Sequence, residues 1–307
     1  MITAERLTKS YGSTRAVAGL SFEVRPGVVT GFLGPNGSGK STTMRLVMGL
    51  DHPDSGTVTI GGRRFHDLRW PLREVGALLE AKAIHPGRSA YNHLLSMAQT
   101  NSIPKARVDE VLGLVGLEAV AGRKAGKFSL GMSQRLGIAS ALLGDPGVLL
   151  FDEPINGLDP EGILWVRTLL QSLAGEGRTI FVSSHLMSEM ALTATDLVVI
   201  GRGELIADTT VEDFIASNTE ATVLVRTPEA DRLYHALSTA GAGVRSRDDG
   251  GLLVTGLDAA RIGDLALESG VALHELSPVQ ASLEEVFMDL TSDMVDYHGH
   301  TPLEVGA

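Results

Sequence analysis

Residues 34–42 read Gly-Pro-Asn-Gly-Ser-Gly-Lys-Ser-Thr and match the pattern G-x-x-x-x-G-K-[ST] in full. An apolar run at 28–33 precedes this loop, and a helix-forming run follows it. Glycines let backbone N–H groups turn toward phosphates, Lys40 supplies a point charge, and Ser41 offers a hydroxyl to Mg²⁺. A glycine turn with a solvated lysine is the alternative, but the strand and helix context favours a nucleotide site. The residues expected to surround the phosphates are Gly34, Pro35, Asn36, Gly37, Ser38, Gly39, Lys40, Ser41 and Thr42.

A second candidate is the acidic pair that ends the apolar run 148–154, Val-Leu-Leu-Phe-Asp-Glu-Pro. A strand with this ending places both carboxylates at the carboxyl edge of a parallel sheet, where such folds bind ligands. Successive strand residues point in opposite directions, so the two carboxylates need not share a role. We expect Asp152 to hold Mg²⁺, and Glu153 to take a proton from the attacking water or to orient it. A solvated acidic turn before Pro154 is the alternative.

A third candidate is the start of the helix-forming segment 128–144, where Ser129 and Gly131 open an otherwise regular helical sequence. A small polar residue and a glycine at a helix N-terminus are typical of anion binding. The chain already has a stronger phosphate loop, so the sequence raises the question of which phosphate this turn serves.

Together these motifs resemble those of the nucleotide-binding subunit of ATP-binding cassette (ABC) transporters, over about residues 2–215. The resemblance implies that Tyr11, in Lys-Ser-Tyr-Gly, stacks on the adenine ring. It also implies that Asp159, in Asn-Gly-Leu-Asp-Pro, lies in the loop that meets the opposite subunit, and that His185 contacts the γ-phosphate as a catalytic residue. Outside this context Tyr11 would be an ordinary strand aromatic and His185 an unremarkable histidine.

The resemblance also answers the question about Ser129 and Gly131. In this family the serine–glycine turn closes over the ATP of a second subunit, so that two chains enclose two nucleotides. The implied cofactors are ATP and Mg²⁺, and the implied partner is a second copy of this chain or a homologous ATPase subunit. An isolated monomer should bind ATP but hydrolyse it poorly.

Two positions depart from the family pattern. The signature, usually Leu-Ser-Gly-Gly-Gln, is Phe-Ser-Leu-Gly-Met at 128–132, and we expect Gln134 to substitute in part for the missing glutamine. Glu80 stands where the family usually has glutamine, which predicts a metal contact and a steeper Mg²⁺ dependence because a further negative charge lies near the phosphates. The alternative is that Glu80 faces solvent and the alignment is off by one residue.

Strands alternating with helices predict an α/β class with a mostly parallel sheet. We expect a P-loop NTPase fold over 1–217, with an antiparallel β edge, a hairpin-like segment at about 56–65 and a helical insertion at about 81–145. The order of elements in 218–291 is βαββαβ, which predicts a small ferredoxin-like α+β domain. The polar residues 292–307 are expected to form a flexible tail.

Composition narrows the function classes. With 43% hydrophobic residues the 307-residue chain can bury a core, and its net charge of −11 argues against a nucleic-acid partner. The absence of cysteine excludes disulfides, cysteine-ligated zinc and thiol catalysis. No signal peptide and no run of about 18 apolar residues is visible. We therefore expect action at the cytoplasmic face of the cell membrane through transmembrane permease subunits, docked on the helical region and its basic segment 122–127. The alternative for this segment is a solvated loop.

The finer resemblance is to exporters of the bacitracin and daunorubicin resistance type. It is carried by Ser-Leu-Gly-Met-Ser-Gln-Arg at 129–135, by Asp-Glu-Pro-Ile-Asn-Gly-Leu-Asp-Pro at 152–160, and by the C-terminal segment 276–287. It implies an ATPase that drives export of a drug-like, antibiotic-like or lipophilic substrate. The alternatives are the ATPase of an importer or of a lipid or polysaccharide exporter, and a soluble ABC ATPase without a transport role. The soluble class that acts on ribosomes would normally carry two cassettes, whereas this chain has one.

Overall fold

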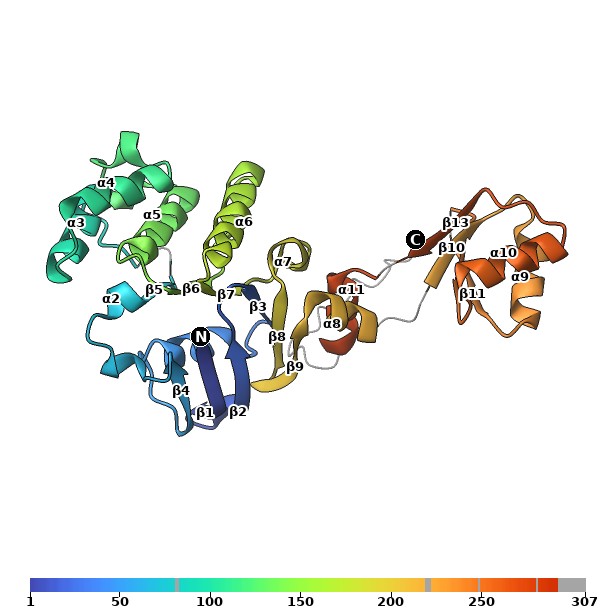
Figure 1. Ribbon diagram of the computed structural model, residues 1–307, viewed down its shortest axis with the longest axis horizontal. Helices are drawn as coiled ribbons and strands as arrows, with labels where there is room; N and C mark the ends of the chain where they lie inside the picture. Colours follow the sequence, from blue (N-terminus) through green and yellow to red (C-terminus); the bar gives the residue numbers. More distant parts are fainter. Residues whose placement is uncertain (81–82, 219–221, 248, 280, 292–307) are drawn as a thin grey trace, which may run out of the picture. The chain divides into compact units, whose positions relative to one another are not determined.

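A computed structural model of the chain describes residues 1–80, 83–218, 222–247, 249–279 and 281–291. The described chain divides into two compact units, Met1–Val211 together with Leu290 and Thr291, and Glu212–Asp289 (Figure 1). The flexible tail predicted at 292–307 lies outside the described residues.

A six-stranded sheet forms the centre of the larger unit, with strand order β5-β6-β7-β3-β8-β9. Neighbours from β5 to β8 pair in parallel, and β9 pairs with β8 in the antiparallel direction, which confirms the predicted sheet and its edge. Every residue of β3 and β7 is buried, because helices and a second sheet cover these central strands. The strands are β3 (Val29–Leu33), β5 (Val75–Leu78), β6 (Val148–Asp152), β7 (Thr179–Ser183), β8 (Asp196–Gly201) and β9 (Glu204–Thr210).

A three-stranded antiparallel sheet of order β2-β1-β4 lies against the central sheet, through stacked rings of Phe22, Phe32 and Phe181 with centroids 4.8–5.9 Å apart. Its strands are β1 (Ile2–Tyr11), β2 (Thr14–Val24) and β4 (Ser55–Ile60). The hairpin-like segment predicted at 56–65 is confirmed only as a tight turn: β4 pairs with β1, and in the described residues a single antiparallel bridge, Ile60 to Arg63, closes the turn. Phe65 instead turns inward onto the core in the short 3₁₀ turn η1 (Phe65–Asp67).

The helices of the larger unit flank the central sheet, and α3, α4 and α5 pack together as the predicted helical insertion (Figure 1). In the part of the chain that the structure describes, every helix is too short or too polar to cross a membrane. The helices are α1 (Lys40–Val47), α2 (Pro71–Glu74), α3 (Ala90–Thr100), α4 (Lys105–Leu114), α5 (Leu130–Leu142), α6 (Pro160–Gly175) and α7 (Met187–Thr193), with 3₁₀ turns η2 (Glu118–Val120) and η3 (Ala125–Lys127).

The smaller unit has the predicted βαββαβ order, and its sheet runs β11-β12-β10-β13 with every pair antiparallel. Both helices between the strands bury apolar residues, among them Leu233, Leu237 and Ile262, in one core with the sheet. The elements of this fold are β10 (Thr222–Arg226), α9 (Ala230–Thr239), β11 (Gly243–Ser246), β12 (Leu252–Thr255), α10 (Ala259–Glu268) and β13 (Glu275–Val279). Helix α8 (Val211–Ser217) precedes it and α11 (Leu283–Thr291) follows it.

Candidate active site

The predicted phosphate loop joins β3 to α1, and two glycines set its path. Gly37 and Gly39 have φ of 80° and 103°. A Cβ on Gly39 would lie 2.2 Å from the backbone oxygen of Ala16, so only glycine fits there. The first N–H groups of α1 have no acceptor within the helix, and the first to bond back is that of Thr43, to Gly39 O at 2.8 Å. The loop therefore presents donors at the positive end of a helix.

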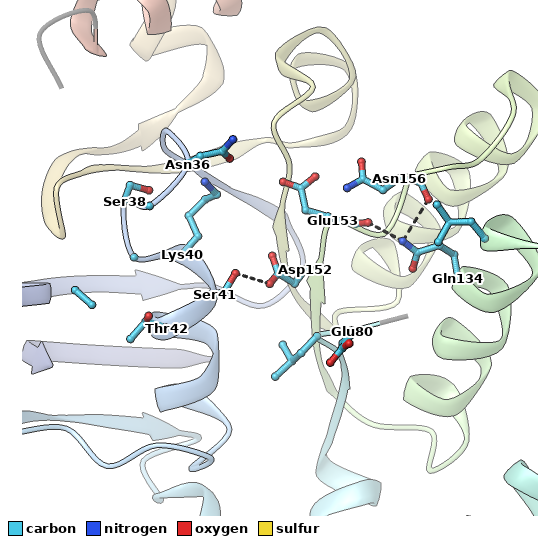
Figure 2. A pocket seen from close by; sticks show the side chains of 15 residues that line it. Asn36, Ser38, Lys40, Ser41, Thr42, Glu80, Gln134, Asp152, Glu153 and Asn156 are labelled. Atoms are coloured by element: carbon cyan, nitrogen blue, oxygen red, sulfur yellow. Dashed lines mark hydrogen bonds between the residues drawn. The ribbon is translucent and has the colours of Figure 1, made fainter. Parts of the chain in front are cut away.

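Lys40 reaches back over this loop. Its Nζ donates to the backbone oxygens of Gly34 at 2.5 Å and Pro35 at 3.0 Å. Burial lowers the pKa of Lys40, and the nearby carboxylates of Glu153 and Asp152 oppose that shift. The ammonium group is thus held where the loop, the helix start and the acidic pair meet (Figure 2).

A cavity of about 560 Å³ opens at this point, and most of the predicted phosphate and metal residues line it. Loop residues 36–42 form one side, and Glu80, Asp152 and Glu153 form another (Figure 2). Leu130 and Gln134, from α5, are also part of the lining. Ser38 faces inward, with a buried hydroxyl that has no hydrogen-bond partner among the described residues.

Asp152 stands at the end of β6 with its two oxygens in different contacts. Oδ2 accepts a hydrogen bond from Ser41 Oγ at 2.8 Å, and Oδ1 accepts one from Ser183 Oγ at 2.5 Å. A serine hydroxyl beside a carboxylate is an oxygen donor set that fits Mg²⁺, which binds through a few protein oxygens together with substrate phosphates and water. Glu80 is exposed and lines the same cavity as Ser41 and Asp152.

Glu153 has a left-handed backbone, with φ of 53°, which is unusual for a residue other than glycine. Its Oε2 lies 2.8 Å from His185 Nδ1 and accepts a longer bond, 3.4 Å, from the backbone N–H of His185. A carboxylate only accepts hydrogen bonds, so Nδ1 carries the proton in this contact. The structure thus brings Glu153 and His185 together, as two groups able to orient one water molecule.

Sequence reasoning missed what Gln134 does. Gln134 is only 4% exposed, and its Nε2 donates to the backbone oxygens of Glu153 at 3.0 Å and Asn156 at 3.3 Å. The expectation that it replaces the missing signature glutamine in part stays a prediction: Nε2 is bonded inside its own chain, whereas Oε1 has no hydrogen-bond partner among the described residues. The buried Ser183, described below, was missed as well, and its only signal was a serine at the end of an apolar strand.

Besides Gly34, Pro35 and His185, which the preceding paragraphs place, four more predicted residues do not line this cavity. Tyr11 is half-exposed at the end of β1, and its hydroxyl donates to Asp51 at 2.8 Å. Ser129 caps α5 by accepting from Met132 N at 3.2 Å, and Asp159 caps α6 by accepting from Gly162 N at 2.9 Å. Gly131 lies in the first turn of α5. Ser129 and Gly131 are therefore not part of the phosphate cavity of their own chain, although Leu130 between them reaches its edge.

Comparison with known proteins gives a consistent result. A family model described as "ABC transporter" matches residues 17–156, and a domain of unknown function matches residues 221–284. The bacitracin transport ATP-binding protein of Bacillus licheniformis is 44% identical over 68% of this chain and 69% of its own length. The Nod factor export ATP-binding protein of Burkholderia pseudomallei is 33% identical over 96% of this chain and 98% of its own length.

Solved structures agree with these relatives. The dimeric structure of a bacterial ABC transporter cassette covers 68% of this chain and 98% of its own, with a TM-score of 0.64 and 25% identity. A dimeric post-hydrolysis state of the same cassette, bound to ADP and Pi, has a TM-score of 0.63 and 26% identity, with the same coverage of both chains.

Proposed function

Because the chain belongs to the family of ABC transporter ATP-binding proteins, we propose that its site works as half of a two-chain ATPase that drives export through a separate membrane subunit. ATP hydrolysis coupled to transport is the activity of this family. One observation supports the two-chain form most directly. The phosphate loop, Asp152 and Glu153 share a cavity, whereas Ser129 and Gly131 do not line it, and from their turn only the side chain of Leu130 does.

In the proposed reaction Lys40 and the first N–H groups of α1 bind the β- and γ-phosphates. Ser41 and Asp152, with Glu80 close by, are the residues that would hold Mg²⁺, which when bound neutralises phosphate charge. Glu153 orients the attacking water and accepts its proton. His185 fixes the Glu153 carboxylate through Nδ1 and contacts the γ-phosphate. Tyr11 stacks on the adenine ring.

Two copies complete the centre. The N-terminus of α5 is a capped helix start with Ser129 exposed, which suits an anion supplied from outside the chain. With ATP bound, the γ-phosphate is shared between the Lys40 of one copy and the Ser129–Gly131 turn of the other, while Asp159 lies at the junction. Hydrolysis removes the shared group, so the copies separate.

Cross-linking tests this arrangement directly, because the chain has no cysteine of its own. Asn36 and Ser129 are both exposed, so each can be replaced by cysteine in the full chain. We expect Asn36→Cys with Ser129→Cys to cross-link between copies with ATP and not with ADP, and each single variant to give no such product. An identical yield with ATP and ADP would contradict the two-chain site.

Two further parts of the proposal concern the membrane. Dimeric cassettes and transport-system relatives support a second copy and a membrane permease as partners in general terms. We propose peripheral attachment at the cytoplasmic face, with the helical region 81–145 as the docking surface. Identification of the membrane protein that co-purifies with the tagged full chain distinguishes an exporter from an importer.

We also propose an antibiotic-like substrate, because the relatives include ATP-binding proteins named for bacitracin and lantibiotic transport. Replacement of the native protein by its Lys40→Ala variant should then raise the sensitivity of the cell to such an antibiotic. Unchanged sensitivity to bacitracin and to lantibiotics would count against this substrate class and would leave the ATPase assignment standing.

A further inference from the structure

Ser183 is a fully buried polar residue at the last position of β7, with 0% of its surface exposed. In the sheet it stands between Asp152 of β6 and Phe32 of β3. A buried hydroxyl in an apolar strand is costly unless it is hydrogen-bonded on both its donor and its acceptor side. Both sides are used here.

The two bonds of Ser183 end on the two acidic residues of the site. Its Oγ donates to Asp152 Oδ1 at 2.5 Å and accepts from the backbone N–H of Glu153 at 3.1 Å. The same N–H also approaches Ser183 O at 3.3 Å. The other oxygen of Asp152, Oδ2, is left to Ser41. The Ser183 hydroxyl therefore connects Asp152, which we propose to bind Mg²⁺, with Glu153, which we propose to orient the attacking water.

Each of the two hydrogen bonds of Ser183 fixes a part of the site: one the orientation of the Asp152 carboxylate, the other the backbone of Glu153. A hydrogen bond to the second oxygen of a metal-binding carboxylate orients the first, and such outer contacts influence metal affinity strongly. The bond to the N–H of Glu153 holds a residue whose φ of 53° is intrinsically unfavourable and persists only when its surroundings fix it. In this backbone conformation the Glu153 carboxylate contacts His185.

We propose that Ser183 is a positioning residue for ATP hydrolysis: its hydroxyl ties the Asp152 carboxylate to the backbone of Glu153, and so sets the metal oxygen and the hydrolytic carboxylate relative to each other. The proposal rests on the ATPase site described above. It assigns Ser183 no contact with the nucleotide, so the effect must appear in the use of Mg²⁺ and in turnover rather than in binding of metal-free ATP.

Four variants of the full chain distinguish the effect of losing the Ser183 hydroxyl from the effect of changing the shape of its side chain. Ser183→Ala removes the hydroxyl, and Ser183→Thr and Ser183→Val have nearly the same shape but differ in the hydroxyl. Ser184→Ala is the matched control, because Ser184 is also buried, at 2% exposure, but among the described residues its Oγ accepts from Leu186 N alone, at 3.0 Å. Melting temperatures report whether each variant is folded.

The first readout is binding of a non-hydrolysable ATP analogue, measured by calorimetry with and without Mg²⁺. We expect Ser183→Ala and Ser183→Val to keep the metal-free affinity and to lose about 10–100-fold of the gain that Mg²⁺ gives. Ser183→Thr and Ser184→Ala should keep that gain. The second readout is kcat for ATP, which should fall by about the same factor in the two variants without a hydroxyl.

The proposal is overturned if Ser183→Ala matches Ser184→Ala in both readouts, or if Ser183→Val performs as well as Ser183→Thr. Failure of the proposed function is a separate result, because it would appear as absence of ATP turnover in the unaltered chain. The binding measurement tests Ser183 even then.

Discussion

Glu153 is the single side chain on which turnover should depend most. Its carboxylate is oriented by His185 and its backbone by Ser183, so replacement by glutamine keeps the shape and removes the basic group. We expect Glu153→Gln to retain ATP binding and to lower kcat by ~10²–10⁴, as for loss of a general base. Steady-state hydrolysis and nucleotide binding measure this, with Glu161→Gln, an exposed carboxylate in the first turn of α6, as the control. Undiminished hydrolysis would remove Glu153 from its assigned role.

Glu80 differs from the glutamine of the family pattern by one charge. It lines the same cavity as Ser41 and Asp152, so its carboxylate adds to the negative charge that ATP meets when Mg²⁺ is absent. We expect Glu80→Gln to reduce the difference in ATP affinity between Mg²⁺-containing and Mg²⁺-free buffer, and to flatten the Mg²⁺ titration of hydrolysis. A titration that superimposes on that of the unaltered chain would show that Glu80 is not a metal contact.

For single residues, the sequence predicts the site residues that are close together along the chain. It misses those that only the fold brings into contact. The phosphate loop and Asp152–Glu153 are contiguous motifs, and the cavity unites them. Gln134 and Ser183 contact Glu153 from 19 and 30 residues away, and nothing in their local sequence distinguishes them from other helix or strand positions. Their roles depend on strand register and helix packing, which a motif does not encode.

Helix α5 and the loop after β6 form a close contact between elements. A Cβ on Gly157 would lie 2.2 Å from Leu130 Cδ2 and 2.6 Å from its Cγ, and the φ of Gly157 is 73°. Leu130 occupies the signature position where the family usually has glycine. The leucine therefore packs in the space that the glycine of the loop leaves free, and the helix that carries Ser129 is fitted to the loop that carries Asp159.

This fit predicts a coupled pair of substitutions. Gly157→Ala should lower the free energy of unfolding by about 1–3 kcal/mol, because it overpacks the contact and strains a left-handed position. Leu130→Ala in the same chain should recover part of that loss, so the double variant costs less than the sum of the singles. Thermal or urea unfolding measures the cycle. Gly147→Ala is the control, since a Cβ there meets nothing within 4 Å. Strict additivity would show that the contact is loose.

The sequence predicts helices and strands correctly where the local residues determine them. It is less accurate where tertiary packing determines the path of the chain. The buried apolar run at 148–154 predicted β6, and the small residues Ser129 and Gly131 predicted the start of α5. The segment after Ile60 has strand-like residues and a glycine turn, yet Phe65 leaves the sheet to join the core. The turn after β4 therefore closes with one bridge, Ile60 to Arg63, and the chain then packs the partly buried Phe65 against the core.

For the whole molecule, the central expectation is that each active centre combines residues of two chains. If so, two variants that fail for different reasons can complement each other. Lys40→Ala disables the phosphate loop of its own chain. Ser129→Asp preserves the cap of α5, because aspartate is a good N-cap, but places a negative charge against the γ-phosphate held by the other chain. Each homodimer then has two defective centres.

A mixed dimer of these variants places both defects in one centre and leaves the other centre intact. Mixing equal amounts of Lys40→Ala and Ser129→Asp chains, each nearly inactive alone, should therefore restore ATP hydrolysis to about one quarter of the unaltered activity, since roughly half of the dimers are mixed and half of their centres are complete. The ATPase rate across mixing ratios measures this, and it should peak at equal amounts. A double variant that carries both changes in one chain is the control, and it should give no recovery with either single variant. If the mixture stays as inactive as its components while mixed dimers form, each chain completes its own centre and the two-chain site is wrong.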